Sequence, residues 1–129
     1  MADLSAYLRR EAARPFALGS ADCCTLAGDW VRLCRGADPM AAHRGYSGER
    51  EALAEVSCWG GLLRAVARGM RSIGCAPTRE PKPGDIAIVR VGVIAGCAIR
   101  SPHGWIMRLN DGMTRVQDHR ARVIAAWRV

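Results

Sequence analysis

The sequence lacks the features that would place the chain in a membrane or tie it to a metal. No apolar run approaches the roughly 20 residues that a membrane-spanning helix needs. The N-terminus, MADLSAYLRREAARP, contains neither an apolar signal-peptide core nor a small-residue cleavage site. The six cysteines include no C-x-x-C pair. We therefore expect synthesis in a cytoplasm, cysteines kept as thiols, and neither a metal ion nor another cofactor.

Lysine is almost absent: Lys82 stands against 18 arginines, and the formal net charge is +7. A nucleic-acid site requires basic residues that cluster on one face of the molecule. Here the arginines are spread along the chain, and Arg64, Arg68 and Arg71 have the spacing of a solvent-exposed helix face. A nucleic-acid partner is therefore not favoured, and a basic exterior accounts for the charge.

The size and composition predict one globular domain. The chain has 129 residues, of which 50% are hydrophobic and 24% charged, so it can bury its own core. No internal repeat or linker divides it, and we expect a single domain over 1–129. Its expected parts are an N-terminal docking helix at 1–14, a helical half at 22–75 and an antiparallel sheet half at 84–129. The predicted fold class is α+β, with the helices first and the sheet second.

The first half of the sequence shows helical periodicity. The pattern predicts four helices, at 2–13, 22–35, 47–57 and 62–74. In the first, Tyr7 lies on the apolar face and Glu11 is expected on the opposite, exposed face. The second has the strongest pattern, with Asp22 as its N-cap and Gly36 as its stop signal.

Beyond Gly84 the pattern changes to short apolar runs separated by turns. The runs are IAIVRV, VIAGCAIR, GWIMRLN, MTRV and VIAAWRV. Such runs predict an antiparallel meander. Asn110-Asp111-Gly112 is a strong hairpin signal, because these residues accept the positive φ that tight turns require.

Most aromatic and sulfur-bearing residues have a packing explanation. We expect core positions for two groups that fall in apolar surroundings: Trp30, Trp105 and Trp127, and Cys58, Cys75 and Cys97. Trp59 and Tyr46 are the aromatic candidates for an interface.

Two adjacent cysteines begin the second predicted helix. A thiol in the first turn of a helix lies at the positive end of the macrodipole, which lowers its pKa and favours the nucleophilic thiolate. Cys23 and Cys24 both qualify, while Asp22 is more simply a helix cap. The alternative is packing, because Cys23 shares its helical stripe with Leu26. The sequence leaves open whether Cys23 or Cys24 faces a cleft.

Two motifs resemble the NlpC-type cell-wall cysteine peptidases, which have a papain-like fold. The motifs are GSADC at 19–23 and KPGDIA at 82–87, and the order of the elements is similar over 15–129. The chain is similar, more closely, to a group of small phage and prophage proteins that are encoded among tail genes. The further motifs shared with that group are DP at 38–39, YS at 46–47 and AWR at 126–128.

The resemblance implies that Cys23 is in the nucleophile position. In the peptidases the catalytic histidine begins the strand after the Gly-Asp strand, and here that stretch reads AGCAI, with Gly96 in the histidine position. His103 lies seven residues further on, in a predicted turn. It is the candidate general base and acid if the protein is active, with Asn110 or Asp111 to orient it.

The remaining histidines, His43 and His119, are expected in solvated loops. Because the imidazole is missing from its expected position, the first hypothesis is a structural or assembly protein of a phage or prophage tail, at the tip. It would use a degenerate peptidase fold to contact tail hub or tip proteins, through the helix at 1–14 and the loop at 37–47. The expected location is the virion tail.

The alternative hypothesis is an active cysteine peptidase or amidase. It would cleave peptidoglycan crosslinks while the phage genome enters the cell, so that peptidoglycan would be its partner.

Overall fold

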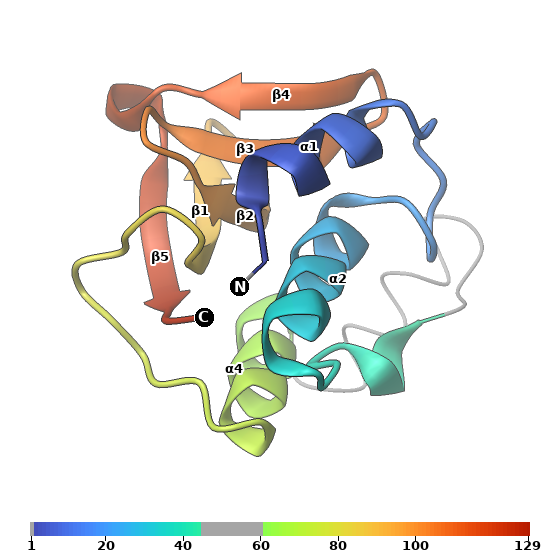
Figure 1. The fold of residues 1–129 in the computed structure, drawn as a ribbon. Helices are drawn as coiled ribbons and strands as arrows, with labels where there is room; N and C mark the ends of the chain where they lie inside the picture. Colours follow the sequence, from blue (N-terminus) through green and yellow to red (C-terminus); the bar gives the residue numbers. More distant parts are fainter. Residues whose placement is uncertain (1, 45–60) are drawn as a thin grey trace.

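The computed structural model describes residues 2–44 and 61–129 and has an α+β fold, which confirms the predicted fold class (Figure 1). The described helices are α1 (Leu4–Ala12), α2 (Cys23–Arg35) and α4 (Leu62–Ser72), with short 3-10 turns η1 (Ala41–His43) and η2 (Asp118–Arg120). The strands are β1 (Ile86–Val91), β2 (Ile94–Arg100), β3 (Trp105–Leu109), β4 (Gly112–Val116) and β5 (Arg122–Trp127). The helix predicted at 47–57 lies outside the described residues. Among those residues, no helix is long and apolar enough to cross a bilayer.

The five strands form one antiparallel sheet in the order β4-β3-β2-β1-β5. The first four strands form consecutive hairpins, and the two-residue turn Asn110-Asp111 joins β3 to β4 as predicted. The expected simple meander is wrong for β5, which crosses the sheet to pair with β1. The reason is burial: residues 86–89 of β1 are all buried and need a neighbour on each side, whereas β4 is mostly half-exposed and remains an edge.

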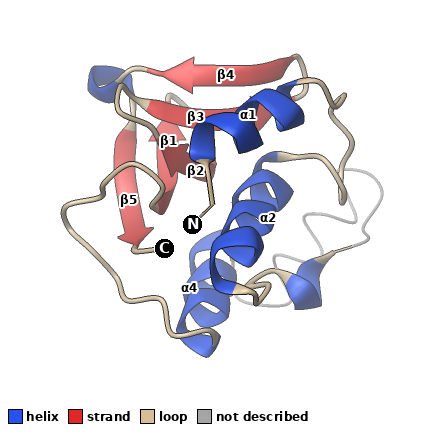
Figure 2. Cartoon of the chain, in the orientation of Figure 1, coloured by secondary structure: helices blue, strands red, loops and turns tan. Residues whose placement is uncertain are grey.

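Helices α1, α2 and α4 lie on one side of the sheet (Figure 2), and the two faces of the sheet carry separate hydrophobic clusters. One face packs against the helices, and its cluster includes Ile88, Cys97 and Trp30. The other cluster is made of sheet residues and contains no residue of a described helix; its buried members are Ala87, Val89, Ala98, Trp105, Met107, Val116 and Ala126. The predicted burial of Trp30, Trp105 and Trp127 is confirmed, while Trp59 and Tyr46 lie outside the described residues.

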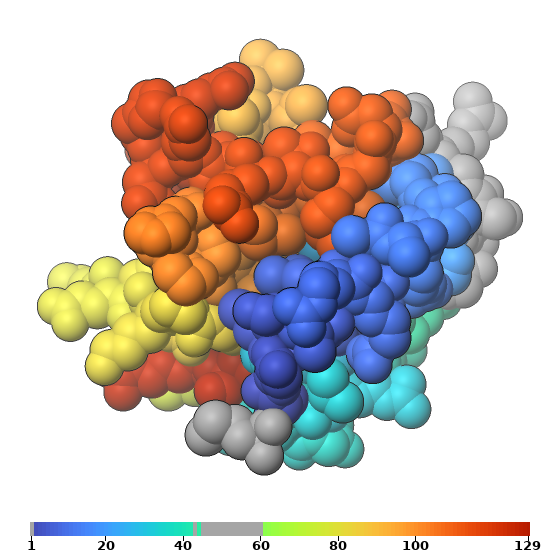
Figure 3. All heavy atoms as spheres, turned by 45° about the horizontal axis from the view of Figure 1, so that its top comes forward, coloured from blue at the N-terminus to red at the C-terminus, as the bar shows by residue number. Residues whose placement is uncertain are grey.

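Helix α1 packs on the molecule's own core. The Tyr7 hydroxyl donates a hydrogen bond of 2.6 Å to the carbonyl of Leu26, and its ring lies 5.3 Å from that of Trp30. In the space-filling view the atoms of α1 lie against those of the β3–β4 hairpin (Figure 3).

The expectation that Glu11 is exposed is wrong. It is 4% exposed, and its carboxylate lies 2.9 Å from the guanidinium of Arg108, which is 1% exposed. Glu11 is four residues after Tyr7, so the helical repeat itself puts both on the buried face. A buried ion pair therefore holds α1 on β3.

Candidate functional site

The first turn of α2 is fixed by its N-cap. The Asp22 carboxylate accepts hydrogen bonds from the backbone N–H of Thr25 at 2.8 Å and of Gly19 at 2.9 Å. The Thr25 hydroxyl in turn accepts from the backbone N–H of Asp22 at 2.8 Å, which completes a capping box. The prediction that Asp22 is a helix cap is confirmed, and Gly36 ends the helix with a φ of 72° as predicted.

Replacing this cap should destabilise the protein. Asp22→Ala leaves the buried N–H groups of Thr25 and Gly19 without their acceptor, so we expect the free energy of unfolding to fall by about 2 kcal/mol in urea denaturation. The matched control is Asp3→Ala at the start of α1, where the exposed carboxylate accepts one bond of 3.2 Å. Its effect should be clearly smaller, and equal losses at the two caps would contradict the argument.

The start of α2 lies where two strands part. Strand β2 pairs with β3 at Ile99–Ile106 and Arg100–Trp105, and α2 contacts both strands. The backbone N–H of Arg100 donates a hydrogen bond to the carbonyl of Asp85, the residue just before β1. Because bonding directions alternate along an antiparallel strand, the N–H of Cys97 points away from β1, and it donates to the sulfur of Cys23. The thiol thus occupies a position that a β3 carbonyl would otherwise take.

Gly96 is the residue of β2 that faces Cys23. A Cβ atom placed on Gly96 would lie 3.1 Å from the Cys23 Sγ and 3.0 Å from the Met107 Cε. Both contacts are tighter than ordinary van der Waals contact, so the present packing suits a residue without a side chain. Cys23 and Gly96 therefore lie side by side. Met107 was not singled out from the sequence, although the alternation in GWIMRLN places it on one face of β3 with Trp105.

The Cys23 thiol is held in its neutral form. Its pKa is raised well above the usual value, first by the hydrogen bond that it shares with Cys24 and then by burial; the N–H of Cys97 acts in the opposite direction and is outweighed. The expectation that the helix start lowers this pKa is therefore wrong. At neutral pH the group is a poor nucleophile.

The neighbouring sulfurs form a small cluster. The Sγ atoms of Cys24 and Cys97 are 3.5 Å apart. The hydrogen bond with Cys23 lowers the pKa of Cys24. The hydrogen bond with Cys97 and burial together outweigh this effect and raise the pKa well above its usual value, so this thiol is neutral too. Burial of Cys75 and Cys97 confirms their packing role, and Cys58 lies outside the described residues. The five described cysteines are free thiols.

The two histidines whose side chains the structure describes lie elsewhere. His103 is exposed in the turn after β2, and His119 is exposed in η2. The pKa of Asp118 is lowered, chiefly by its hydrogen bond from Arg100, with smaller contributions from His103 and His119. Strand β2 alone carries the chain about 13 Å from Gly96 to Arg100, and His103 lies beyond that end.

The other candidate residues are also apart from the thiol. His43 is in η1, which follows the C-terminal end of α2, and nothing is described of its side chain. Asn110 and Asp111 are exposed in the β3–β4 turn. The structure therefore brings Cys23 together with Gly96, Cys24 and Cys97, and it does not bring it together with His103.

The carboxylates of the motifs have structural partners. Asp29 pairs with Arg44 at 2.8 Å, and Asp85 accepts from the backbone N–H of Lys82 at 2.8 Å and of Val129 at 3.1 Å. The Gly-Asp motif thus ties the end of the chain to the start of β1. Across 2–44 and 61–129, no three side chains of the metal-binding types form a group that could hold an ion.

These features define an α+β protein in which a cysteine-headed helix packs its first turn against an antiparallel sheet. The chain belongs to the family described as Domain of unknown function (DUF6950), whose model matches residues 1–129. No curated protein and no solved structure matched the chain.

Proposed function

We propose that the chain has a papain-like, NlpC-type fold and works as a structural component of a phage or prophage tail, holding other tail proteins instead of cutting a substrate. The observation that carries the proposal is the contact between Gly96 and the Cys23 sulfur. A thiol peptidase needs a base there to take the thiol proton and later protonate the leaving amine. A glycine can do neither.

The state of the thiol supports the same function. A raised pKa and a hydrogen bond to Cys24 keep the proton on Cys23 at neutral pH, whereas a nucleophile of this class needs a lowered pKa. The bonds between Asp22 and Thr25 fix the first turn of the helix, and the N–H of Cys97 joins that turn to the sheet, as a structural element requires.

The surface also supports contact with other proteins. Leu63 of α4 and Val123 and Ile124 of β5 are large, exposed hydrophobic residues, and they line a hollow of about 630 Å³. Exposed Arg9 and Arg10 of α1 add polar contacts of the type found at interfaces. The proposed partners are tail hub or tip proteins. The loop at 37–47 remains a candidate contact surface, although its last residues lie outside the described ones.

The second candidate is an active cysteine peptidase or amidase that acts on peptidoglycan. The observation in its favour is the place of Cys23, partly exposed at the start of a capped helix. It would need His103 to reach the sulfur from the far end of β2, which requires a rearrangement of the turn.

The two functions are separated by one set of variants. We expect the purified protein not to clear peptidoglycan sacculi in a turbidity assay. Deletion of the gene from the phage or prophage should abolish assembled tails seen by electron microscopy, and the Cys23→Ser and Cys34→Ser genes should both restore them. Cys34 is the matched control because it is exposed at the other end of α2.

Clearing by the wild-type protein that Cys23→Ser removes would establish the enzyme instead. Normal tails in the deletion strain would exclude the structural function whatever the outcome of the turbidity assay.

A further inference from the structure

A small cavity lies on the face of the sheet that no described helix covers. It measures about 160 Å³ and is bounded by the end of the β1–β2 hairpin, β3, β4 and η2. Five of its lining residues are apolar, Val91, Ile94, Met107, Leu109 and Val116, and Thr114, Arg115 and Arg120 complete the lining. In Figure 3 the hairpin and the segment around η2 lie side by side at the top edge of the molecule. The cavity is thus mainly apolar, with two arginines at its margin.

Its size suits a small ring or a short aliphatic chain. An apolar protein cavity of about 150 Å³ stays free of water and takes up benzene, because water gains too few hydrogen bonds inside it. The present cavity is similar in volume but opens to solvent, since Ile94 is 54% exposed, and five of its lining residues carry hydrocarbon or thioether side chains. A ligand with about six carbon atoms would therefore replace poorly bonded solvent.

Arg120 supplies a charge without a partner. Its side chain is exposed in η2, and its guanidinium has no ion pair within the described part of the chain. The acidic residue of the same turn, Asp118, is already held by two hydrogen bonds from Arg100. A guanidinium matches the two oxygens of a carboxylate, which it binds with paired hydrogen bonds.

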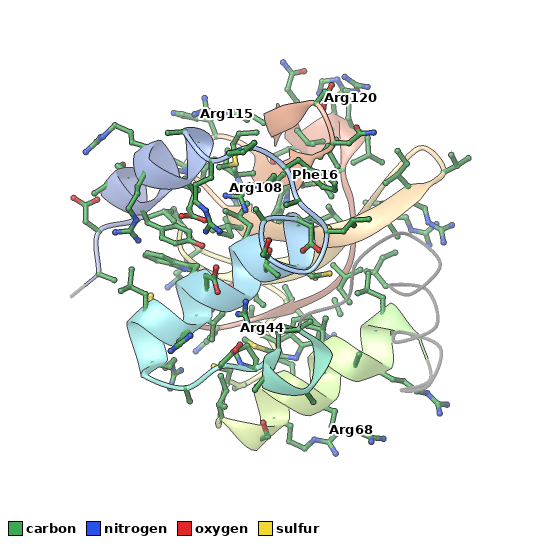
Figure 4. All side chains as sticks on the ribbon, turned by 90° about the vertical axis from the view of Figure 1, so that its right-hand side faces the viewer. Phe16, Arg44, Arg68, Arg108, Arg115 and Arg120 are labelled. Carbon is green, nitrogen blue, oxygen red and sulfur yellow. The ribbon has the colours of Figure 1, made fainter. Side chains whose placement is uncertain are left out.

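Arg115 differs from Arg120 although it also borders the cavity. It stands in β4 between Thr114 and Val116, and side chains alternate between the two faces of a strand. Val116 belongs to the cluster on the cavity face, so the side chain of Arg115 starts from the opposite face. Figure 4 shows the two arginines on different sides at the top of the molecule.

We infer that this cavity binds a small apolar carboxylate, with its hydrocarbon part against Met107 and its carboxylate on Arg120. The inference is independent of the tail function, because protein–protein contact does not require a ligand there. Met107 lines this cavity and also lies against Gly96, where a Cβ atom would be 3.0 Å from its Cε. Both a free carboxylic acid and a carboxylate on a larger molecule share this chemistry.

The methionine methyl groups give a direct test. Protein labelled with carbon-13 at these methyls is titrated with benzoate, and in parallel with benzyl alcohol as an uncharged analogue. The Met107 resonance, assigned with Met107→Leu, should shift in a saturable way. The resonances of Met40 and Met70, which are buried in the cluster on the helix side, should not move. Benzoate should bind about fivefold more tightly than benzyl alcohol, the size of one exposed charge contact.

Arg120→Gln should remove this preference, so that both probes bind equally. Arg115→Gln makes the same change of charge and should leave the preference intact. Unchanged Met40 and Met70 resonances show that each variant is folded. The inference is overturned if Met107 shows no saturable shift with either probe, if the neutral analogue binds as tightly as benzoate to the wild type, or if the two arginine variants lose the preference equally.

To distinguish the two sources of the carboxylate, the titration is repeated with a short peptide that ends in phenylalanine. A shift of Met107 by the peptide as well as by benzoate indicates a carboxylate on a larger molecule. A shift by benzoate alone indicates a free acid.

Discussion

Iodoacetamide at neutral pH will alkylate Cys23 of the folded protein far more slowly than Cys23 of the unfolded chain. Only the thiolate reacts, and each unit by which folding raises a thiol pKa lowers the thiolate fraction about tenfold. Because the pKa of Cys23 is raised well above the usual value, we expect a difference of more than about tenfold. The rate is followed by mass spectrometry of the Cys23 peptide, with and without urea.

The exposed Cys34 provides the control within the same molecule, and it should be alkylated before Cys23 in the folded state. The Cys23 rate should also stay low until the pH exceeds the ordinary thiol pKa. Rapid and selective alkylation of Cys23 at neutral pH would contradict the raised pKa and support the peptidase.

A substitution at position 96 should have the opposite effect and make Cys23 more reactive. A histidine there would meet the sulfur and Met107, so Gly96→His is combined with Met107→Ala to make room. An imidazolium beside the sulfur favours the thiolate, and alkylation of Cys23 should become faster. The control is Gly96→Gln with Met107→Ala, which fills a similar space without a base and should leave the rate low.

Local patterns were sufficient to predict the elements that carry the site. The cap at Asp22, the stop at Gly36 and the turn at Asn110-Asp111 each rest on backbone chemistry within a few residues, and the structure has them where they were expected. The position of Gly96 opposite Cys23 came from a resemblance between motifs, and the contact distance agrees with it.

Properties that depend on distant parts of the chain could not be predicted in this way. The pKa of Cys23 is raised first by the adjacent Cys24 and then by burial, which depends on the packing of the helix against the sheet; the N–H of Cys97, 74 positions away, acts in the opposite direction. The pairing of β5 with β1 depends on which strands need two neighbours, and a list of strands does not contain that information.

The largest change in stability should come from Arg108. Arg108→Met removes the cation and leaves the Glu11 carboxylate buried without its partner, which should lower the free energy of unfolding by about 3–5 kcal/mol. The pair spans 97 positions and joins α1 to β3. Urea denaturation gives the loss, and hydrogen exchange of the α1 amides should become faster.

The control uses the same carboxylate. Arg14 also lies 2.9 Å from Glu11, but its side chain is 43% exposed, so Arg14→Met should cost less than about 1 kcal/mol. Among the described residues, the Arg108 Nη1 is a buried donor without a partner, and an unbonded buried donor reduces the net benefit of the pair. Replacing both members with apolar residues, Glu11→Leu with Arg108→Met, should therefore restore stability to within about 1 kcal/mol of the wild type. If the double variant is as unstable as Arg108→Met alone, the penalty lies in lost packing of the long side chain and not in the unpaired charge.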